Sequence, residues 1–185
     1  MIFQDQQSKD HCMRKAILLV ILSSTLSPGF GQDLMPTNPD AVRTVDGIVN
    51  EMLHIVSGEA GKKRDWEAFR RLFLSTARFT VRYQDSSFHM PIATLTIDEF
   101  IEYMGDDYYD EGFIEYELGK TVDEYNGIAS VFQSYYARDG VGDAEMGINS
   151  YQLVFFKDRW WIVNVLWTGD RNGEPIPRKY LNNKR

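Results

Sequence analysis

Cysteine and histidine are scarce in this chain. Its 185 residues include one cysteine, Cys12, and three histidines. A single cysteine cannot form a disulfide framework, and Cys12 lies ahead of the segment in which we expect the folded domain. His54 and His89 are the two histidines in that segment, and they are too far apart in sequence to suggest a histidine-based metal site. We therefore predict a domain that is held together by core packing and that carries no metal and no organic cofactor.

Long hydrophobic runs are missing as well. The most apolar stretch, residues 16–22 (AILLVIL), is far shorter than the roughly 20 apolar residues that a membrane-spanning helix needs. Arg14 and Lys15 stand directly before this stretch. A basic region followed by a short apolar region is typical of a secretory signal peptide.

The segment after the apolar stretch fits the same interpretation. Gly29 and Gly31 are small residues at the positions that a signal peptidase requires, which predicts cleavage before Gln32. We therefore expect residues 1–31 to be a signal peptide, with Met13 as an alternative start, and residues 32–185 to form one domain. The protein would be secreted or periplasmic, without a stable membrane anchor.

Positive charge is in deficit. The chain has 20 Lys and Arg residues against 27 Asp and Glu residues, which gives a formal net charge of −7. Proteins that bind nucleic acid need clustered basic side chains to neutralise phosphates. The basic pairs in the last residues of the chain, at 178–179 and 184–185, are expected to form a solvated tail. We predict no nucleic-acid partner.

Three segments have the periodicity of amphipathic helices. Apolar residues recur at spacings of three and four between residues 42 and 56, and a short second helix is expected after Asp65. The pair Thr96 and Glu99 has the spacing of a capping box, which predicts the start of a third helix. An acidic stretch, residues 106–111, ends this third helix before Gly112.

The pattern changes from helical to alternating after the third helix. Strands are expected at residues 78–83, 113–122, 128–138, 147–157 and 160–168. The last four are joined by short polar links, and Asn126-Gly127 predicts a tight hairpin. Short links between consecutive strands indicate an antiparallel meander. We predict an α+β domain in which the helices pack on one face of the sheet.

The order of these elements resembles that of the NTF2-like superfamily, in its SnoaL-like branch. The similarity is carried by residues 128–139, 147–154 and 159–168, and it extends over about residues 40–181. The resemblance implies a cone in which three N-terminal helices pack on a curved antiparallel sheet, with a pocket between them. It also implies a homodimer through the outer face of the sheet.

The resemblance specifies the fold more closely than the activity. Enzymes of the superfamily include ketosteroid isomerase, scytalone dehydratase, limonene epoxide hydrolase and polyketide cyclases. Their catalytic residues have no position-by-position match in this chain. Because one fold supports unrelated chemistries, the function has to be argued from the residues that would line the pocket.

Six residues are our candidates for ligand binding. They are Tyr136, Tyr151, Asn164, Trp167, Glu115 and His89. Alternation places Asn164 on the face of the last strand that carries Trp160 and Ile162, and Trp167 on the opposite face. A mostly aromatic pocket with a few polar groups is typical of small-molecule sites.

Two main functions remain open at this stage. The first is a secreted binding domain for a small apolar or aromatic molecule. The second is a small lyase, isomerase or hydrolase that uses a carboxylate such as Glu115 or Asp65. A purely structural dimer fits equally well. A pocket with only apolar and aromatic groups would exclude the enzyme, whereas a pocket carboxylate with a strongly raised pKa would argue against a passive binder.

Overall fold

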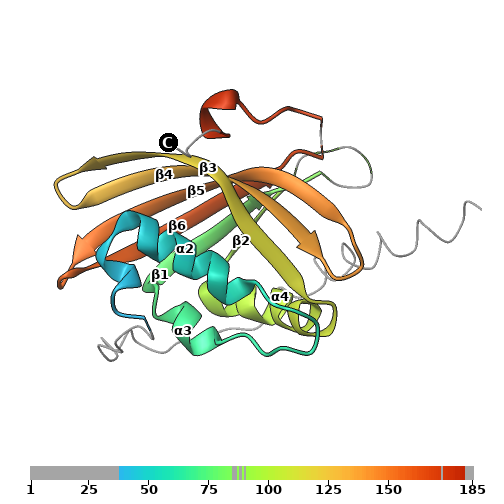
Figure 1. Cartoon of the computed structure of the whole chain (residues 1–185), viewed down its shortest axis with the longest axis horizontal. Coiled ribbons are helices and arrows are strands. Elements are labelled where there is room, and N and C mark those ends of the chain that lie inside the picture. Colours follow the sequence, from blue (N-terminus) through green and yellow to red (C-terminus); the bar gives the residue numbers. More distant parts are fainter. Residues whose placement is uncertain (1–37, 85–86, 88, 90, 172, 182–185) are drawn as a thin grey trace, which may run out of the picture.

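A curved sheet with helices on one face makes up the domain (Figure 1). The computed structural model describes residues 38–84, 87, 89, 91–171 and 173–181. The helices are η2 (Ala41–Arg43), α2 (Val45–Val56), α3 (Trp66–Arg70), α4 (Ile97–Asp110) and η3 (Arg178–Tyr180). The strands are β1 (Phe73–Arg82), β2 (Ile92–Leu95), β3 (Phe113–Tyr125), β4 (Ile128–Asp139), β5 (Ala144–Phe156) and β6 (Arg159–Gly169).

The sheet has six strands in the order β2-β1-β6-β5-β4-β3. The predicted meander is confirmed for β3 to β6, which pair antiparallel with their sequence neighbours. The prediction of a purely antiparallel sheet is wrong, because β1 runs parallel to β6. These two strands are distant in sequence, so no short link determines their relative direction. The short strand β2, which pairs with β1, lies where we expected a loop.

The helices α3 and α4 start at the predicted capping residues, whereas α2 starts at Thr44. Thr96 and Glu99 form the capping box of α4, with each side chain accepting from the backbone N–H of the other. The Asp65 side chain accepts from Ala68 at the start of α3. Among the described residues, α2 and α3 precede the sheet, whereas α4 lies between β2 and β3. The expectation of three helices ahead of the sheet is corrected in one respect, because the third of them, α4, lies within the sequence of the sheet. None of the helices in the described ranges is long and apolar enough to cross a bilayer.

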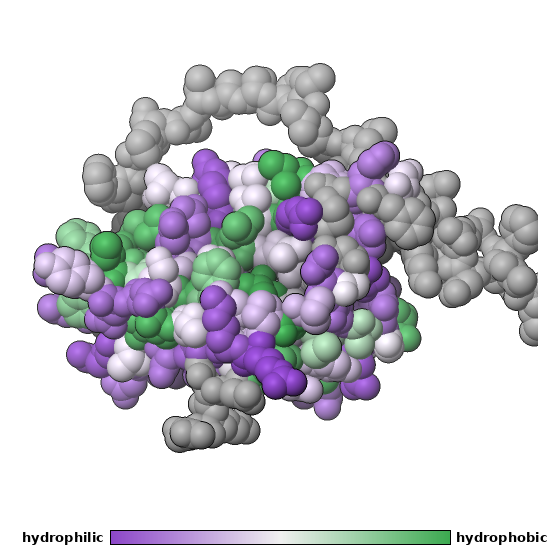
Figure 2. Space-filling view, turned by 90° about the horizontal axis from the view of Figure 1, so that it is seen from above, coloured by the Kyte–Doolittle hydropathy of each residue, from purple (hydrophilic) through white to green (hydrophobic). Residues whose placement is uncertain are grey.

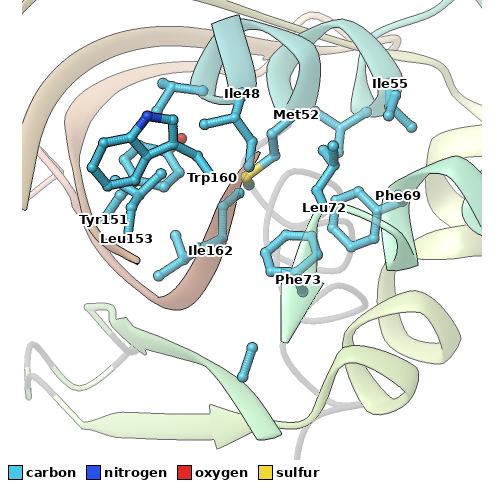
Figure 3. Packing of buried hydrophobic residues seen from close by; sticks show 14 of the residues in the cluster. Ile48, Met52, Ile55, Phe69, Leu72, Phe73, Tyr151, Leu153, Trp160 and Ile162 are labelled. Atoms are coloured by element: carbon cyan, nitrogen blue, oxygen red, sulfur yellow. The ribbon is translucent and has the colours of Figure 1, made fainter. Parts of the chain in front are cut away.

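The core lies between the helices and the inner, concave face of the sheet (Figure 3). Phe69 of α3 packs between Phe73 and Phe100, with ring centroids 4.8 and 5.5 Å away. Phe100 of α4 also stacks on Phe79 of β1 at 4.4 Å. The apolar stripe of α2 is buried against Leu153 and the other inward residues of β5 and β6. Aromatic pairs at these distances add to the stabilisation from burial alone.

Irregularities in β3 and β6 change which side chains face the core. In β6 the register shifts between Ile162 and Asn164, so that Ile162 pairs with Leu153 but Asn164 pairs with Gln152. The prediction that Asn164 shares a face with Ile162 is therefore wrong, because the extra residue Val163 turns Asn164 outward. The same bulge brings Trp167 to the core face with Ile162, so the prediction that Trp167 lies on the opposite face is also wrong. In β3 the register shifts between Glu117 and Gly119. This second bulge determines the composition of the concave face.

Candidate functional site

Eight polar side chains lie on the concave face at the β3 side of the sheet. We call them the polar cluster: Glu115, Glu117 and Lys120 of β3, Gln133 and Tyr135 of β4, and Glu145, Asn149 and Tyr151 of β5. Gln133 and Tyr151 are completely buried, which is unusual for polar groups unless they are hydrogen-bonded. The hydrogen bonds within the polar cluster provide that compensation.

Gln133 is the centre of these hydrogen bonds. Its side-chain oxygen accepts from Tyr151 Oη at 3.2 Å and from Asn149 Nδ2 at 3.4 Å. Its Nε2 donates to Glu117 Oε2 at 2.8 Å. The Asn149 amide also donates to Glu115 Oε1 at 2.7 Å. Two buried amides thus link the β3 carboxyl groups to β5: Asn149 bonds Glu115 directly, and Gln133 connects Glu117 to Asn149 and Tyr151.

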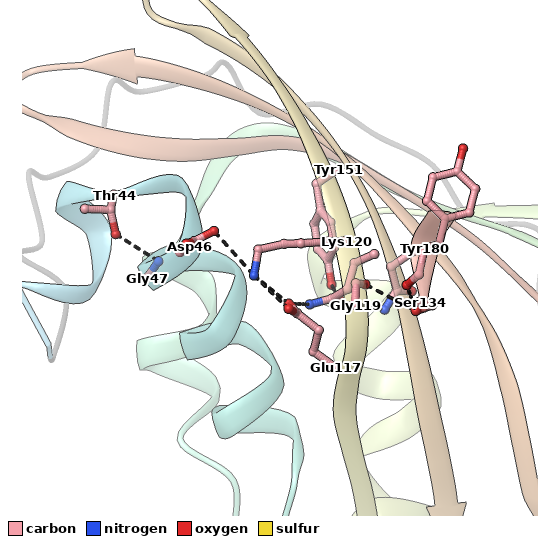
Figure 4. Close-up of polar contacts among 11 residues, drawn as sticks. Thr44, Asp46, Gly47, Glu117, Gly119, Lys120, Ser134, Tyr151 and Tyr180 are labelled. Carbon is pink, nitrogen blue, oxygen red and sulfur yellow. Dashed lines mark hydrogen bonds and ion pairs between the residues drawn. The ribbon is translucent and has the colours of Figure 1, made fainter. Parts of the chain in front are cut away.

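Lys120 balances the charge of Glu117. Its Nζ lies 2.8 Å from both Glu117 carboxylate oxygens and 3.3 Å from Asp46 Oδ1 of α2 (Figure 4). The Lys120 and Glu117 side chains are 12% and 22% exposed, so this ion pair is only partly screened by water. Glu117 is thereby paired with a cation and with an amide donor.

A second carboxylate, Glu145, is paired at the other side of the polar cluster. It accepts from Tyr135 Oη at 2.9 Å and from Arg171 Nε at 2.9 Å. The Tyr135 hydroxyl group lies where a side chain at Gly147 would be, and the Glu145 carboxylate lies where a side chain at Gly169 would be. Both glycines are required for these two groups to lie against the sheet.

Glu115 differs from the other two glutamates because no basic side chain of the described residues forms an ion pair with it. It is partly exposed, and it stands across the small Ala137 from Glu145. Burial raises the pKa of Glu115 from 4.5 to about 7, against the lowering effect of the Asn149 hydrogen bond. The negative charge of Glu145 raises it further. Near neutral pH, Glu115 is therefore present in both protonation states.

Three tyrosines next to these carboxylates are held in the neutral form. Burial raises the pKa values of Tyr108, Tyr135 and Tyr151, and the charge of Glu115 raises each of them further. Tyr108 of α4 also stacks on the Phe113 ring at a centroid distance of 4.3 Å. As neutral phenols they keep their single O–H proton, which Tyr135 donates to Glu145 and Tyr151 donates to Gln133.

The structure brings three of the six predicted site residues together on the concave face. Glu115 and Tyr151 belong to the polar cluster, and Trp167 of β6 pairs across the sheet with Asn149. Trp167 also makes edge contacts with the Phe79 and Phe100 rings.

The other three predicted residues lie elsewhere. Tyr136 is on the outer face of the sheet, 5.1 Å from the Tyr116 ring. Asn164 is also on the outer face and donates to Gln152 at 3.2 Å. His89 is exposed in the segment between β1 and β2. A role of any of the six in ligand binding stays a prediction.

Several residues of the polar cluster were missed by sequence reasoning. The alternation Val131, Gln133, Tyr135, Ala137 would have placed Gln133 and Tyr135 on the core face, so a signal for them existed. No such signal exists for Lys120, because simple alternation puts it on the face opposite Glu117. In the part of the chain that the structure describes, no three Asp, Glu, His or Cys side chains are grouped as a metal site would need.

Comparisons with known proteins identify the fold. No family model matches the sequence, and no curated protein matches it. An NTF2-like superfamily protein from Salmonella enterica is similar in structure, with a TM-score of 0.50 and 13% identity over 66% of this chain and 85% of that chain. A proposed dehydratase of the NTF2-like family from Streptomyces avermitilis has a TM-score of 0.50 and 15% identity over 71% of this chain and 98% of that chain. The chain therefore has the NTF2-like fold, as predicted, and at these identities the similarity defines the fold alone.

The raised pKa of Glu115 predicts an unusual pH dependence of stability. Between pH 4.5 and about 7 the folded protein keeps a proton on Glu115 that the unfolded chain releases. The contribution of this group to stability therefore falls as the pH rises through this window, by at most about 1.4 kcal/mol per pH unit. We expect Glu115→Gln to gain stability relative to the wild type over this range, measured by urea unfolding at a series of pH values.

The matched control is Glu124→Gln, which changes an exposed glutamate on the same strand. Its stability difference from the wild type should stay nearly constant with pH. A carboxyl signal of Glu115 that titrates at the ordinary glutamate pKa in NMR would contradict the assignment.

Proposed function

We propose that the concave face binds a small molecule and that Glu115 acts on it as a general acid–base, in a lyase or isomerase type of reaction. One observation carries the proposal: Glu115 is a partly buried carboxyl group with a pKa of about 7, a hydrogen bond from Asn149 and no paired cation. General acid–base groups work best when their pKa lies near the operating pH.

The reaction needs one group that takes a proton and returns it. In its ionised form Glu115 would accept a proton from a C–H bond next to an electron-withdrawing group of the substrate. The resulting glutamic acid would return this proton to a leaving hydroxyl group, releasing water, or to another carbon, completing an isomerisation. The neutral Tyr108 would donate a hydrogen bond to a substrate oxygen that gains negative charge.

Elimination of water is the form of this chemistry that we favour. The structurally similar Streptomyces avermitilis protein is a proposed dehydratase with the same fold. This similarity supports the choice of reaction class only, because the two chains share 15% identity.

Binding without chemistry is the second candidate function. It is favoured by apolar side chains that border the core and stay partly exposed, among them Trp167, Met104 and Trp66. These groups would hold a small apolar or aromatic molecule, with the polar cluster orienting it. In this alternative Glu115 would bind the ligand but move no proton.

A base-catalysed elimination on a synthetic probe tests the catalytic proposal. Nitrobenzisoxazole is a small aromatic molecule that a carboxylate opens by removing its ring C–H proton, while the N–O bond breaks and a coloured cyanonitrophenolate forms. We expect the wild type to accelerate this reaction with a rate that rises through an apparent pKa of about 7. Glu115→Gln should lower the rate by about 10²- to 10⁴-fold.

Glu124→Gln is again the matched control and should retain the wild-type rate. If Glu115→Gln retains it as well, Glu115 is not the base. If neither the wild type nor Glu115→Gln shows saturable binding of the probe by NMR, the binding function is refuted as well.

We propose that the protein forms a homodimer through the outer face of the sheet, as members of the SnoaL-like branch would. Figure 2 looks onto the side of the molecule that carries η3, where hydrophobic and hydrophilic side chains are interspersed. On the outer face, Leu166 of β6 is 48% exposed and Met146 of β5 is 40% exposed. Exposed apolar side chains on one sheet face favour a protein interface.

The dimer is tested by light scattering after size-exclusion chromatography. We expect a dimer mass for the wild type and a monomer mass for Leu166→Glu, because a carboxylate in the interface would be desolvated without a partner. Ile92→Glu, at an exposed position of β2, is the control and should stay dimeric. A monomeric wild type at micromolar concentration would refute the interface.

We also propose that the protein is secreted, with cleavage of the signal peptide before Gln32. Residues 1–37 lie outside the described residues, so the support comes from the sequence pattern alone. Expressed as the full chain in a Gram-negative host, the periplasmic protein should begin at Gln32 in N-terminal sequencing. Leu19→Arg, which interrupts the apolar stretch, should block export. An uncleaved wild type in the cytoplasmic fraction would contradict secretion.

A further inference from the structure

The C-terminal segment, residues 175–181, lies on the outer face of the sheet, on the side opposite the helices (Figure 1). The ring of Tyr180, the last residue of η3, stacks on Phe132 of β4 with centroids 5.6 Å apart. The Ser134 hydroxyl lies 2.5 Å from the carbonyl oxygen of Tyr180 and 3.2 Å from that of Gly119 (Figure 4). The segment thus contacts both β3 and β4.

The approach to β3 is a backbone contact that only glycine permits. A Cβ atom at Gly119 would overlap with the carbonyl oxygen of Tyr180 and would also press on Leu181. The φ angle of Gly119 is not in the left-handed region, so its own backbone conformation would accept alanine. The contact with the C-terminal segment is therefore the reason that glycine is needed here.

The two contacted strand residues lie directly behind the polar cluster. Gly119 stands between the bulge residue Leu118 and Lys120, and Ser134 stands between Gln133 and Tyr135. Because successive side chains alternate between the faces, a residue held from the outer face fixes its neighbours on the concave face. Ser134 and Gly119 are both buried, as the covering segment requires.

The point of contact is also where β3 is most able to slip. A bulge interrupts the ladder of backbone hydrogen bonds, and a shift of one residue moves every following side chain to the other face. If the bulge were lost, Lys120 would turn outward, away from Glu117 and Asp46. Glu117 would then be left without its cation.

We propose that residues 175–181 form a positioning strap, which holds the β3 bulge from the outer face and thereby keeps Lys120, Glu117 and Gln133 in place on the concave face. Gly119 and Ser134 are the positioning residues through which the strap acts. The effect of the strap on the positions of these three side chains is argued from the contacts above alone. Any effect on catalysis rests in addition on the proposed function of Glu115.

Point variants in the full-length chain test the strap. Gly119→Ala should displace it, and Ser134→Ala should weaken it. We expect the backbone amides of residues 178–181 to lose about tenfold or more of their hydrogen-exchange protection in Gly119→Ala, with a smaller loss in Ser134→Ala. Ser150→Ala changes the outer face of the neighbouring strand β5 and is the matched control.

The decisive readout is the state of the concave face at a temperature well below unfolding. NMR signals of the Gln133 and Asn149 side-chain amides and of the Lys120 ammonium group should shift in Gly119→Ala and stay unchanged in Ser150→Ala. A strap that loses protection while these signals stay in place would overturn the proposal. Unchanged protection of residues 178–181 in Gly119→Ala would overturn it too.

A second route covers the case that Gly119→Ala does not fold. A protease site introduced at residues 173–174 allows the strap to be cut after the full chain has folded, and the same signals should then shift. The test of the strap and the test of Glu115 as the base can fail independently of each other. Shifted signals together with an unaltered probe reaction in Glu115→Gln would retain the strap and reject Glu115 as the base.

Discussion

One extra residue in β3, Leu118, determines the chemistry of the concave face. With strict alternation Glu117 would face the core and Lys120 would face outward. Because the bulge shifts the register, both point inward and lie 2.8 Å apart. A carboxylate moved out of water without a partner is costly, whereas one that is paired and hydrogen-bonded is tolerated. The bulge therefore makes a partly buried Glu117 compatible with a stable fold.

This pairing explains why Glu115 behaves differently from its neighbours. Lys120 forms ion pairs with Glu117 and Asp46, and Arg171 forms ion pairs with Glu145 and Asp143. Neither cation pairs with Glu115, which has only an amide donor for its carboxyl group. Protonation is then the less costly way to keep this group on a partly buried face, and its pKa rises accordingly.

Much of this architecture could be predicted from the sequence because it follows from local signals. Helical spacing, the Thr96–Glu99 capping box and period-two alternation located three helices and five of the six strands. The Asn126-Gly127 turn has positive φ angles at both residues, as its sequence predicts. The parallel pairing of β1 with β6 could not be predicted, because it depends on contacts between distant segments. The strand β2, which pairs with the neighbouring β1, was missed because it has only 4 residues. The faces on which Asn164 and Lys120 lie could not be predicted either, since the alternation of residue types does not indicate where a strand has a bulge.

The polar cluster also constrains what the concave face can bind. Gln133, Asn149 and Tyr151 already satisfy one another, so a ligand gains little by competing for them. Glu115 is different, since its carboxyl group is partly exposed and has one hydrogen bond to protein side chains. A purely apolar molecule placed over it would remove water from this group without replacing its hydrogen bonds. A ligand of this face therefore needs a polar group directed at Glu115 together with an apolar body, and that requirement applies equally to a substrate and to a passively bound molecule.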